Sequence, residues 1–303
     1  MGRVFRWAED LDPTEVEAKV IACANHGVMA DCRQNIANPN DIQLGDVRAD
    51  VLVALALRLR EDWPVYAHGI EIAYANVTGA FDLFGLHNPL GGPAALPFLF
   101  RRCQFKEPIV LDHSRLSSLQ FEDCEFFKPS SNQNVIISAK AVSIDGPLSL
   151  EGSRMNAEGV GTFGTVDLTD ARIAGPAHFN ALAGHWAFLA QGLHVDGRLD
   201  FSDCDAAGAA NAVARRRRRD RLPDNLRDPD FQTSISANLR NLNVAGDFSA
   251  SGSSFKARTP LNGAALDLSN GTVAGTIHLD TSKNKAIKIE NWDIKTEDLF
   301  FHS

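Results

Sequence analysis

Residues 164–196 read GTVDLTDARIA, GPAHFNALAGH and WAFLAQGLHVD, and these three consecutive frames of eleven residues carry the pattern that predicts the fold. When the opening residue is counted as zero, positions 2, 4, 7 and 9 of each frame are apolar or small. In the first frame these positions hold Val166, Leu168, Ala171 and Ile173. The template also fits frames that open at residues 68, 96, 107, 117, 135, 146, 197, 235, 246, 264 and 285, and more loosely at 79, 175 and 275.

The frame predicts short strands joined by corners. Positions 2 and 4, like positions 7 and 9, have the two-residue period of inward-facing side chains on a strand. The step from 4 to 7 breaks this period, so a corner is expected there, and glycine at several frame openings is expected to give the backbone freedom for a second corner. Such faces form a square coil, and stacked coils pair their backbone groups with one another. Two frames per coil predict roughly eight coils and a rod on the order of 40 Å long.

Three cysteines, Cys103, Cys124 and Cys204, fall at the small inward position 7. A buried thiol packs like a small apolar side chain, so we expect core residues here and not redox or metal-binding groups. The five cysteines include no C-x-x-C pair, which favours reduced thiols and a cytoplasmic location. Residues 1–10 lack the apolar core of a signal peptide, and the most apolar run, residues 51–59, is too short to cross a bilayer.

Residues 237–241 read ANLRN, a unit of the form A-[DN]-L-x-x, and residues 166–170 (VDLTD) are a degenerate copy. In these units the chain resembles the pentapeptide-repeat proteins over about residues 44–295. The resemblance implies an all-β solenoid, the right-handed quadrilateral parallel β-helix. The D-W-P element at residues 62–64 and the preceding segment also resemble a bacterial group that is often named membrane-associated oxidoreductase. No motif in this sequence supports membrane association or oxidoreductase activity.

Residues 1–64 are predicted to form a small α-helical N-terminal cap, and residues 65–303 the β-helix. The sequence DPTE at 12–15 places a capping residue, a proline and an acid where a first helix would begin. A second helix is expected over residues 46–60, with one apolar stripe formed by Val47, Val51, Leu55 and Leu59. A β-helix exposes strand edges at its first coil, so a cover is the expected role of this segment. A partner-binding helical hairpin is the alternative.

The repeat stops between Cys204 and Ile235, and residues 206–231 are predicted to be a loop extruded from a coil corner. This segment contains six arginines in seven residues: Arg215, Arg216, Arg217, Arg218, Arg219 and Arg221. Without them the net charge of −8 becomes −8 − 6 = −14, so the body is acidic. The loop is either solvated or in contact with that body, or it binds an acidic partner, nucleic acid or an anionic membrane.

Position 3 of the frame, which should face outward, is often acidic. It holds Glu71, Asp82, Asp167, Asp200 and Asp267, and stacked frames would place some of these residues in an acidic column along one face. The column is either a solvated face or a partner-binding surface. Paired carboxylates for sugar cleavage are the enzymatic alternative.

No catalytic, cofactor-binding or metal site is predicted. Residues 159–164 (GVGTFG) match G-x-G-x-x-G, but the residues that follow have strand spacing and not the helix that a dinucleotide site requires. The nine histidines include no H-x-x-x-H pair, and His178 and His278 both fall at the outward position 3.

The favoured function is a non-catalytic scaffold that binds another protein through an elongated acidic face, with the arginine-rich loop as a second contact. Inhibitor, immunity and regulatory-subunit roles are all compatible with this expectation, and no small-molecule substrate is expected. The alternatives are an enzyme on a β-helix, either carbohydrate-active or redox, and nucleic-acid or anionic-membrane binding through residues 215–221.

Overall fold

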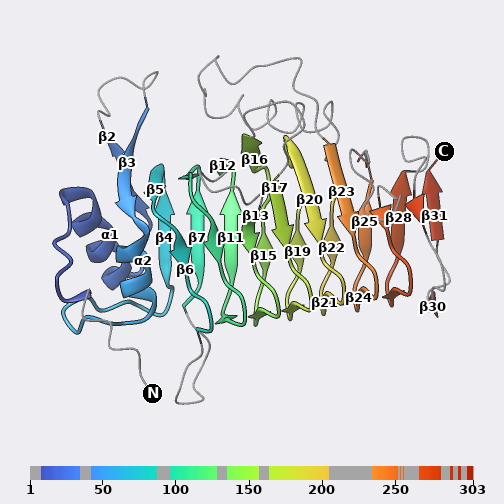
Figure 1. The fold of residues 1–303 in the computed structure, drawn as a ribbon, viewed down its shortest axis with the longest axis horizontal. Helices are drawn as coiled ribbons and strands as arrows, with labels where there is room; N and C mark the ends of the chain where they lie inside the picture. Colours follow the sequence, from blue (N-terminus) through green and yellow to red (C-terminus); the bar gives the residue numbers. More distant parts are fainter. Residues whose placement is uncertain are drawn as a thin grey trace.

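The computed structural model describes residues 8–34, 42–86, 96–127, 135–156, 164–204, 234–251, 253, 255, 266–280, 287–288, 293–294 and 299–302. In this part of the chain the structure is mostly β, with two short helices and four sheets (Figure 1). All strand pairs are parallel except β2 with β3, which are antiparallel. We name the sheets I to IV in the order in which the chain visits them.

Sheets I and II contain the first strands of the chain. Sheet I has the order β1 (Ala30–Asp31), β4 (Ile70–Ala73), β7 (Phe98–Arg101), β11 (Leu119–Glu122), β15 (Leu148–Ser149), β19 (Ala177–His178), β22 (Leu199–Asp200), β25 (Phe248–Ala250), β28 (Ile277–Asp280) and β31 (Leu299–His302). Sheet II has the order β16 (Arg154–Asn156), β12 (Glu125–Phe127), β8 (Gln104–Phe105), β5 (Ala75–Thr78), β3 (Gln43–Arg48) and β2 (Arg33–Gln34).

Sheets III and IV complete the array. Sheet III has the order β29 (Ile287–Lys288), β26 (Leu266–Asp267), β23 (Ser234–Asn238), β20 (His185–Leu189), β17 (Gly164–Asp167), β13 (Val135–Ser138), β9 (Ile109–Val110) and β6 (Phe81–Asp82). Sheet IV has the order β10 (Arg115–Leu116), β14 (Ser143–Ile144), β18 (Arg172–Ile173), β21 (His194–Val195), β24 (Asn243–Val244), β27 (Thr272–Val273) and β30 (Asp293–Ile294).

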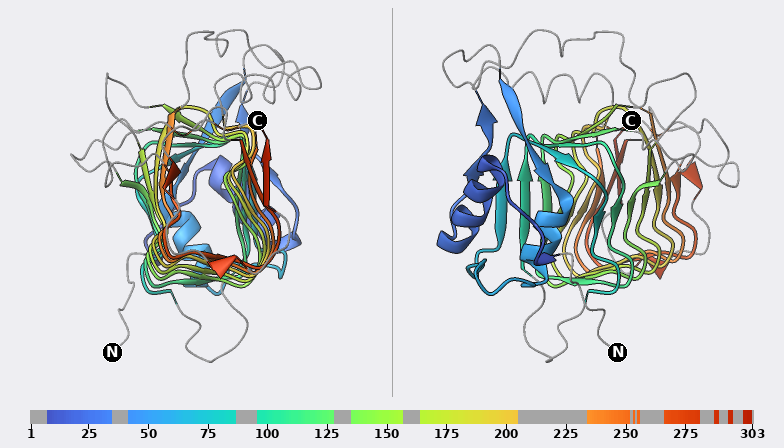
Figure 2. Two further views of the ribbon diagram at one scale, coloured as in Figure 1. Left: turned by 90° about the vertical axis from the view of Figure 1, so that its right-hand side faces the viewer. Right: turned by 60° about the vertical axis from the view of Figure 1, so that its left-hand side comes forward.

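From β7 to β19 successive strands fall in sheets I, II, III and IV in turn, and after β19 they fall in sheets I, III and IV. Paired residues of the fitted frames hold the same frame position, except at the bulge where Val135 pairs with Thr165. In sheet I, for example, position 2 gives the in-register series Leu148, Ala177, Leu199, Phe248 and Ile277. The nine spacings of this ten-stranded sheet, at about 4.8 Å each, give a length of about 43 Å. Figure 2 shows the four sheets surrounding a common interior.

The predicted corner between positions 4 and 7 is confirmed, and it depends on a left-handed residue at position 6. In one such turn the Ala171 amide donates to the Leu168 carbonyl oxygen at 3.0 Å, and Asp170 between them has a φ of 57°. Position 6 has a positive φ at Tyr74, Gly85, Arg102, His113, Asp123, Ala141, Gly152, Asp170, Ala181, Gly192, Asp203, Asn241 and Asn270. Most of these residues carry a Cβ, so most of these corners bear the steric cost of the left-handed conformation.

The expected role of the frame-opening glycines is confirmed at Gly79, which has a φ of 84°, but it is wrong for the glycines that stack on one another. Gly175, Gly197, Gly246 and Gly275 have no left-handed φ. They lie directly against the preceding circuit instead. A Cβ on Gly175 would lie 2.6 Å from the Gly146 carbonyl carbon, and a Cβ on Gly246 would lie 2.8 Å from that of Gly197. Glycine is required here because neighbouring backbones approach too closely for any side chain.

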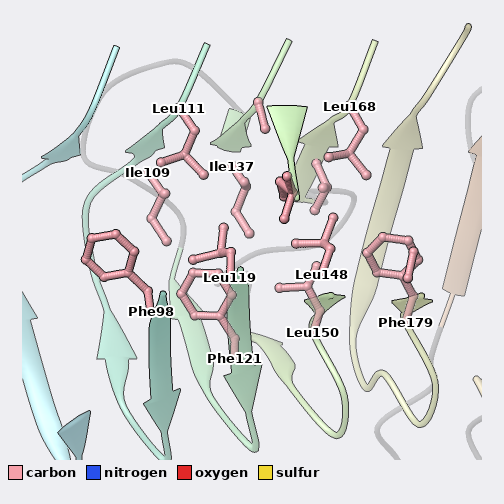
Figure 3. Close-up of a cluster of buried hydrophobic side chains, with 14 of the residues drawn as sticks. Phe98, Ile109, Leu111, Leu119, Phe121, Ile137, Leu148, Leu150, Leu168 and Phe179 are labelled. Carbon is pink, nitrogen blue, oxygen red and sulfur yellow. The ribbon is translucent and has the colours of Figure 1, made fainter. Parts of the chain in front are cut away.

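The frame positions predicted to face inward form the core. Val166, Leu168, Ala171 and Ile173 are at most 1 % exposed, and Figure 3 shows apolar side chains from successive circuits in contact with one another. A cavity of about 10 Å³ lies among them, enough for one water at most.

Many of the phenylalanines stack along the array in this core. The ring centroids of Phe100 and Phe121 are 5.3 Å apart, and those of Phe105 and Phe126 are 5.4 Å apart. The rings of Phe100 and Phe105 meet edge to face at 5.2 Å. Because in-register strands repeat the same inward position, these rings form two columns with the geometries that aromatic pairs prefer.

Helix α1 (Glu15–His26) begins two residues later than expected. Thr14, and not Asp12, is its N-cap: the Thr14 hydroxyl accepts from the Glu17 amide, and the Glu17 carboxylate accepts from the Thr14 amide. Glu17 is 1 % exposed and also accepts hydrogen bonds from the Arg48 backbone amide and guanidinium, with Nη2 to Oε2 at 2.7 Å. The capping box is therefore reinforced by a contact with a residue 31 positions away.

The segment predicted to be helical also contains strands. Helix α2 (Ala49–Ala56) is shorter than the expected 46–60, because Gln43–Arg48 forms β3 and pairs with β5. β1 likewise pairs with β4, so the sheets begin before residue 65. All but one of the α2 residues are buried, and α2 contacts β3 and β6. Both helices lie at the end of the array formed by β1 and β3 (Figures 1 and 2).

Candidate interaction surfaces

The arginine-rich segment, residues 215–221, lies outside the described residues. It lies in the stretch 205–233, between the buried Cys204 and β23. Residues 159–163 of the glycine-rich motif lie outside as well. The last glycine of that motif, Gly164, begins strand β17 and not a helix, so the residues after it lack the helix N-terminus that a dinucleotide site needs.

The four position-3 aspartates do not form one acidic column, and that expectation is corrected. Asp82, Asp167 and Asp267 lie in sheet III and Asp200 in sheet I, because alternate frames pass through different sheets. Within sheet III each aspartate is three strands from the next. Val110 and Ser138 separate Asp82 from Asp167, and Leu189 and Asn238 separate Asp167 from Asp267. Three spacings are about 14 Å, beyond the separation of the paired carboxylates in glycoside hydrolases.

The expectation that position 3 faces solvent is wrong for three of these aspartates, whose carboxylates are buried and hydrogen-bonded. Asp167, Asp200 and Asp267 are 6 %, 8 % and 2 % exposed. In each, Oδ1 accepts from the backbone amide and the hydroxyl two residues ahead, in Thr169, Ser202 and Ser269 respectively. This contact braces the start of the left-handed corner. Asp82 is exposed and its Oδ1 accepts from the Phe84 amide at 2.9 Å. Partner binding by these aspartates stays a prediction.

The outer face of sheet I brings together side chains that are distant in the sequence. His178, Asp200, Ser249 and His278 lie on four adjacent strands in register. The Ser202 hydroxyl links two of them, with its Oγ 2.5 Å from Asp200 Oδ1 and 2.8 Å from Ser249 Oγ. Two strands separate the histidines, and in the described part of the chain no three His, Cys, Asp or Glu residues are arranged to hold a metal ion.

The cysteines are core residues, as expected. Cys103, Cys124 and Cys204 are fully buried, and the thiols of Cys124 and Cys204 donate to the carbonyl oxygens of Phe100 and Phe179 at 3.3 and 3.0 Å. Burial raises the pKa of the Cys124 thiol above its ordinary value and that of Cys204 to about 12. These thiols stay protonated at neutral pH, and a protonated thiol is a poor nucleophile and metal ligand.

Sheet II presents an outer surface that the sequence did not reveal. Asp46, Asn76, Gln104 and Glu125 lie side by side on β3, β5, β8 and β12, and we call this row the polar ladder. The Asn76 amide donates to Asp46 Oδ1 at 2.6 Å, and the Gln104 amide donates to Glu125 Oε2 at 3.0 Å. Asn76, Gln104 and Glu125 share frame position 8, whose outward direction was predictable, but the addition of β3 to this sheet was not.

Comparisons with family models, with curated proteins and with solved structures find no match to this chain. No helix in the described residues has the length and apolar character needed to cross a membrane.

Proposed function

We propose that the chain is a right-handed quadrilateral parallel β-helix of pentapeptide-repeat type whose first circuit is capped by α1 and α2. The cyclic order of the strands, which visit four sheets from β7 to β19, supports this assignment, as does the pairing of equal frame positions. The cap is supported by the burial of α2 and its contacts with β3 and β6. Five free thiols, four of them buried, fit a reducing compartment, and we propose the cytoplasm.

The function that we propose for this fold is a non-catalytic scaffold that binds another protein along an outer face. The observation that carries the proposal is the in-register stacking of the strands. It turns single frame positions into continuous rows of outward side chains, such as Asn76, Gln104, Glu125 and Arg154 on sheet II. A long row of fixed side chains suits an extended macromolecular surface better than a small substrate.

Affinity capture from the native host, followed by mass spectrometry, tests the proposal. The wild type is compared with a variant in which Arg215–Arg219 are replaced by serine. Arg172→Ser, at an exposed position on sheet IV, is the control for loss of a surface arginine. A discrete protein partner recovered by all three supports the scaffold role. A protein lost only with the five-serine variant places that segment in the interface.

Two outcomes would contradict the scaffold proposal. Nucleic acid or anionic lipid that depends on residues 215–219 would transfer the function to the arginine-rich segment. Failure to recover any macromolecule would favour the enzymatic alternative and a substrate screen.

A further inference from the structure

A series of backbone hydrogen bonds runs along the corner that follows sheet I, and we call it the corner series. At each step the amide at frame position 6 donates to the position-5 carbonyl oxygen of the next circuit. The Tyr74 amide donates to the Arg101 carbonyl oxygen at 3.0 Å. One circuit earlier, the Cys32 amide donates to the Ala73 carbonyl oxygen at 2.9 Å. The same bond joins Arg102 to Glu122, Asp123 to Glu151, Gly152 to Asn180, Ala181 to Ser202 and Asp203 to Ser251. Each circuit therefore offers a carbonyl acceptor to the circuit before it.

The corner series ends at β1, where a side chain of α1 takes the place of the next amide. In the described residues β1 is the first strand of sheet I. The N–H and C=O of a trans peptide group point in opposite directions, and the Cys32 N–H points toward β4. The Asp31 carbonyl oxygen therefore faces away from β4, and there it accepts a hydrogen bond from Lys19 Nζ. The Lys19 ammonium occupies the position of the backbone donor that a further circuit would supply.

Helix α1 is attached to the sheets by few buried side chains. Of its twelve residues, Glu17, Val20 and Ala24 are buried, whereas all but one of the eight α2 residues are buried. One of the three is a carboxylate, and it accepts hydrogen bonds from the Arg48 backbone amide and guanidinium. Because it buries so little apolar surface, α1 is the part of the N-terminal segment that a single substitution can separate from the sheets.

The other sheets have different covers at this end of the array. In sheet II the last strand, β2, pairs with β3. In sheet III α2 contacts β6, and in sheet IV the Arg115 amide of β10 donates to the Leu86 carbonyl oxygen at 2.8 Å. Displacement of α1 would therefore free the edge of sheet I and leave these covers in place.

We propose that α1 prevents a second copy of the chain from adding to β1 head to tail, and that Lys19 does so by occupying the Asp31 acceptor. Sheet I itself carries the matching donors. The amide at position 4 faces the following strand, as the Phe201 amide does when it donates to the Ser249 carbonyl oxygen at 2.7 Å. Phe301 holds the equivalent place in β31, the last strand of sheet I in the described residues, so its amide faces away from β28. β31 of one copy and β1 of another can therefore pair in the parallel sense of the whole sheet.

A second copy is the matched occupant because its strands have the same frame and the same direction. This inference rests on the proposed cap at the first circuit and not on the scaffold function. Self-association and partner capture are measured separately, so either proposal can fail while the other stands.

Analytical ultracentrifugation of the full chain measures self-association over a range of concentrations. Val20→Asp places a carboxylate at a buried site under α1, so it should displace the helix and strengthen self-association at least about tenfold relative to the wild type. Lys19→Met keeps that packing and removes the donor to Asp31, so it should strengthen self-association about threefold. Lys106→Met, at an exposed lysine that follows β8, should leave it unchanged. Thermal unfolding of each variant verifies that it is folded.

Two further measurements locate the contact. Phe301→Pro, added to Val20→Asp, removes the backbone donor that β31 would present and should abolish the association. Hydrogen exchange of the Val20→Asp variant should show faster exchange in α1, and it should show protection of β1 that increases with concentration.

Three results would overturn the inference. The first is a folded Val20→Asp variant that associates no more strongly than the wild type. If Val20→Asp does not fold, Lys19→Met decides in its place, and wild-type behaviour of that variant would overturn the inference equally. The second is self-association that survives Phe301→Pro, because it would exclude pairing through β31. The third is an assembly in which β1 gains no protection from hydrogen exchange.

Discussion

Replacing an exposed alanine by glycine should stabilise this protein at one position and destabilise it at another. Ala141 occupies a left-handed corner with a φ of 51°, and its side chain is exposed, so Ala141→Gly removes no core contact. The left-handed conformation costs an L-residue about 1–2 kcal/mol, which glycine avoids. Glycine in turn costs about 0.5–1 kcal/mol through the greater freedom of the unfolded chain. The net expectation is a gain of about 0.5–1 kcal/mol in the free energy of unfolding.

Ala174 provides the matched control. It is also exposed, but it has no positive φ and its amide donates to the Ile144 carbonyl oxygen at 2.8 Å. Ala174→Gly should therefore lose about 0.5–1 kcal/mol, so that the two variants differ by about 1–2 kcal/mol. Urea unfolding followed by circular dichroism measures both midpoints. If Ala141→Gly were as destabilising as Ala174→Gly, the left-handed corner at position 6 would be refuted, and with it the geometry of every frame.

Three further predictions concern the core, the helix cap and the thiols. Leu168→Asp places a charge at a site that is 1 % exposed, and it should cost several kcal/mol; an unchanged melting temperature would contradict the assigned inward positions. Burial raises the pKa of Glu17, but its hydrogen bonds with Arg48 and the backbone lower it more, to a net value below 4.5. The stabilisation by Glu17 is thus complete above pH 4.5 and is lost as the pH falls through the folded pKa. Glu17→Gln should lower stability by about 1–3 kcal/mol at neutral pH and by less in acid, as urea unfolding at the two pH values would show. Iodoacetamide at mildly alkaline pH should modify the half-buried Cys23 in the native protein. It should modify Cys204, whose pKa is raised to about 12 by burial, only after unfolding. If mass spectrometry showed that native Cys204 is labelled as fast as Cys23, its burial would be contradicted.

The eleven-residue frame was enough to predict which residues face inward and where the chain turns. It could not show that alternate frames pass through different sheets, and so the expected acidic column separated into Asp200 on sheet I and three distant aspartates on sheet III. A position-3 aspartate followed by a hydroxyl residue two positions later marks a locally bonded carboxylate. That signal was present in the sequence at Asp167, Asp200 and Asp267.

The N-terminal segment was less predictable because its structure depends on distant residues. The sequence DPTE offers two capping residues, and Thr14 is used because Glu17 can then bond both to it and to Arg48. Residues 43–48 lack the frame and form β3 because β5 lies beside them. The position of Asp46 beside Asn76 in the polar ladder follows from that pairing, so no motif in the sequence pointed to it.

Because each circuit pairs with the next, folding can propagate from one circuit to its neighbour along the chain. Leu199 pairs with Ala177 across 22 residues, but Phe248 pairs with Leu199 across 49, because residues 205–233 intervene. By the logarithmic dependence of loop-closure entropy on length, the longer closure costs about 0.7 kcal/mol more. Folding that starts at the helical end would therefore slow after β22 has formed. Unfolding that starts at the C-terminal end would pause once β25 has detached from β22. The boundary between β22 and β25 is thus where a partly folded chain would accumulate.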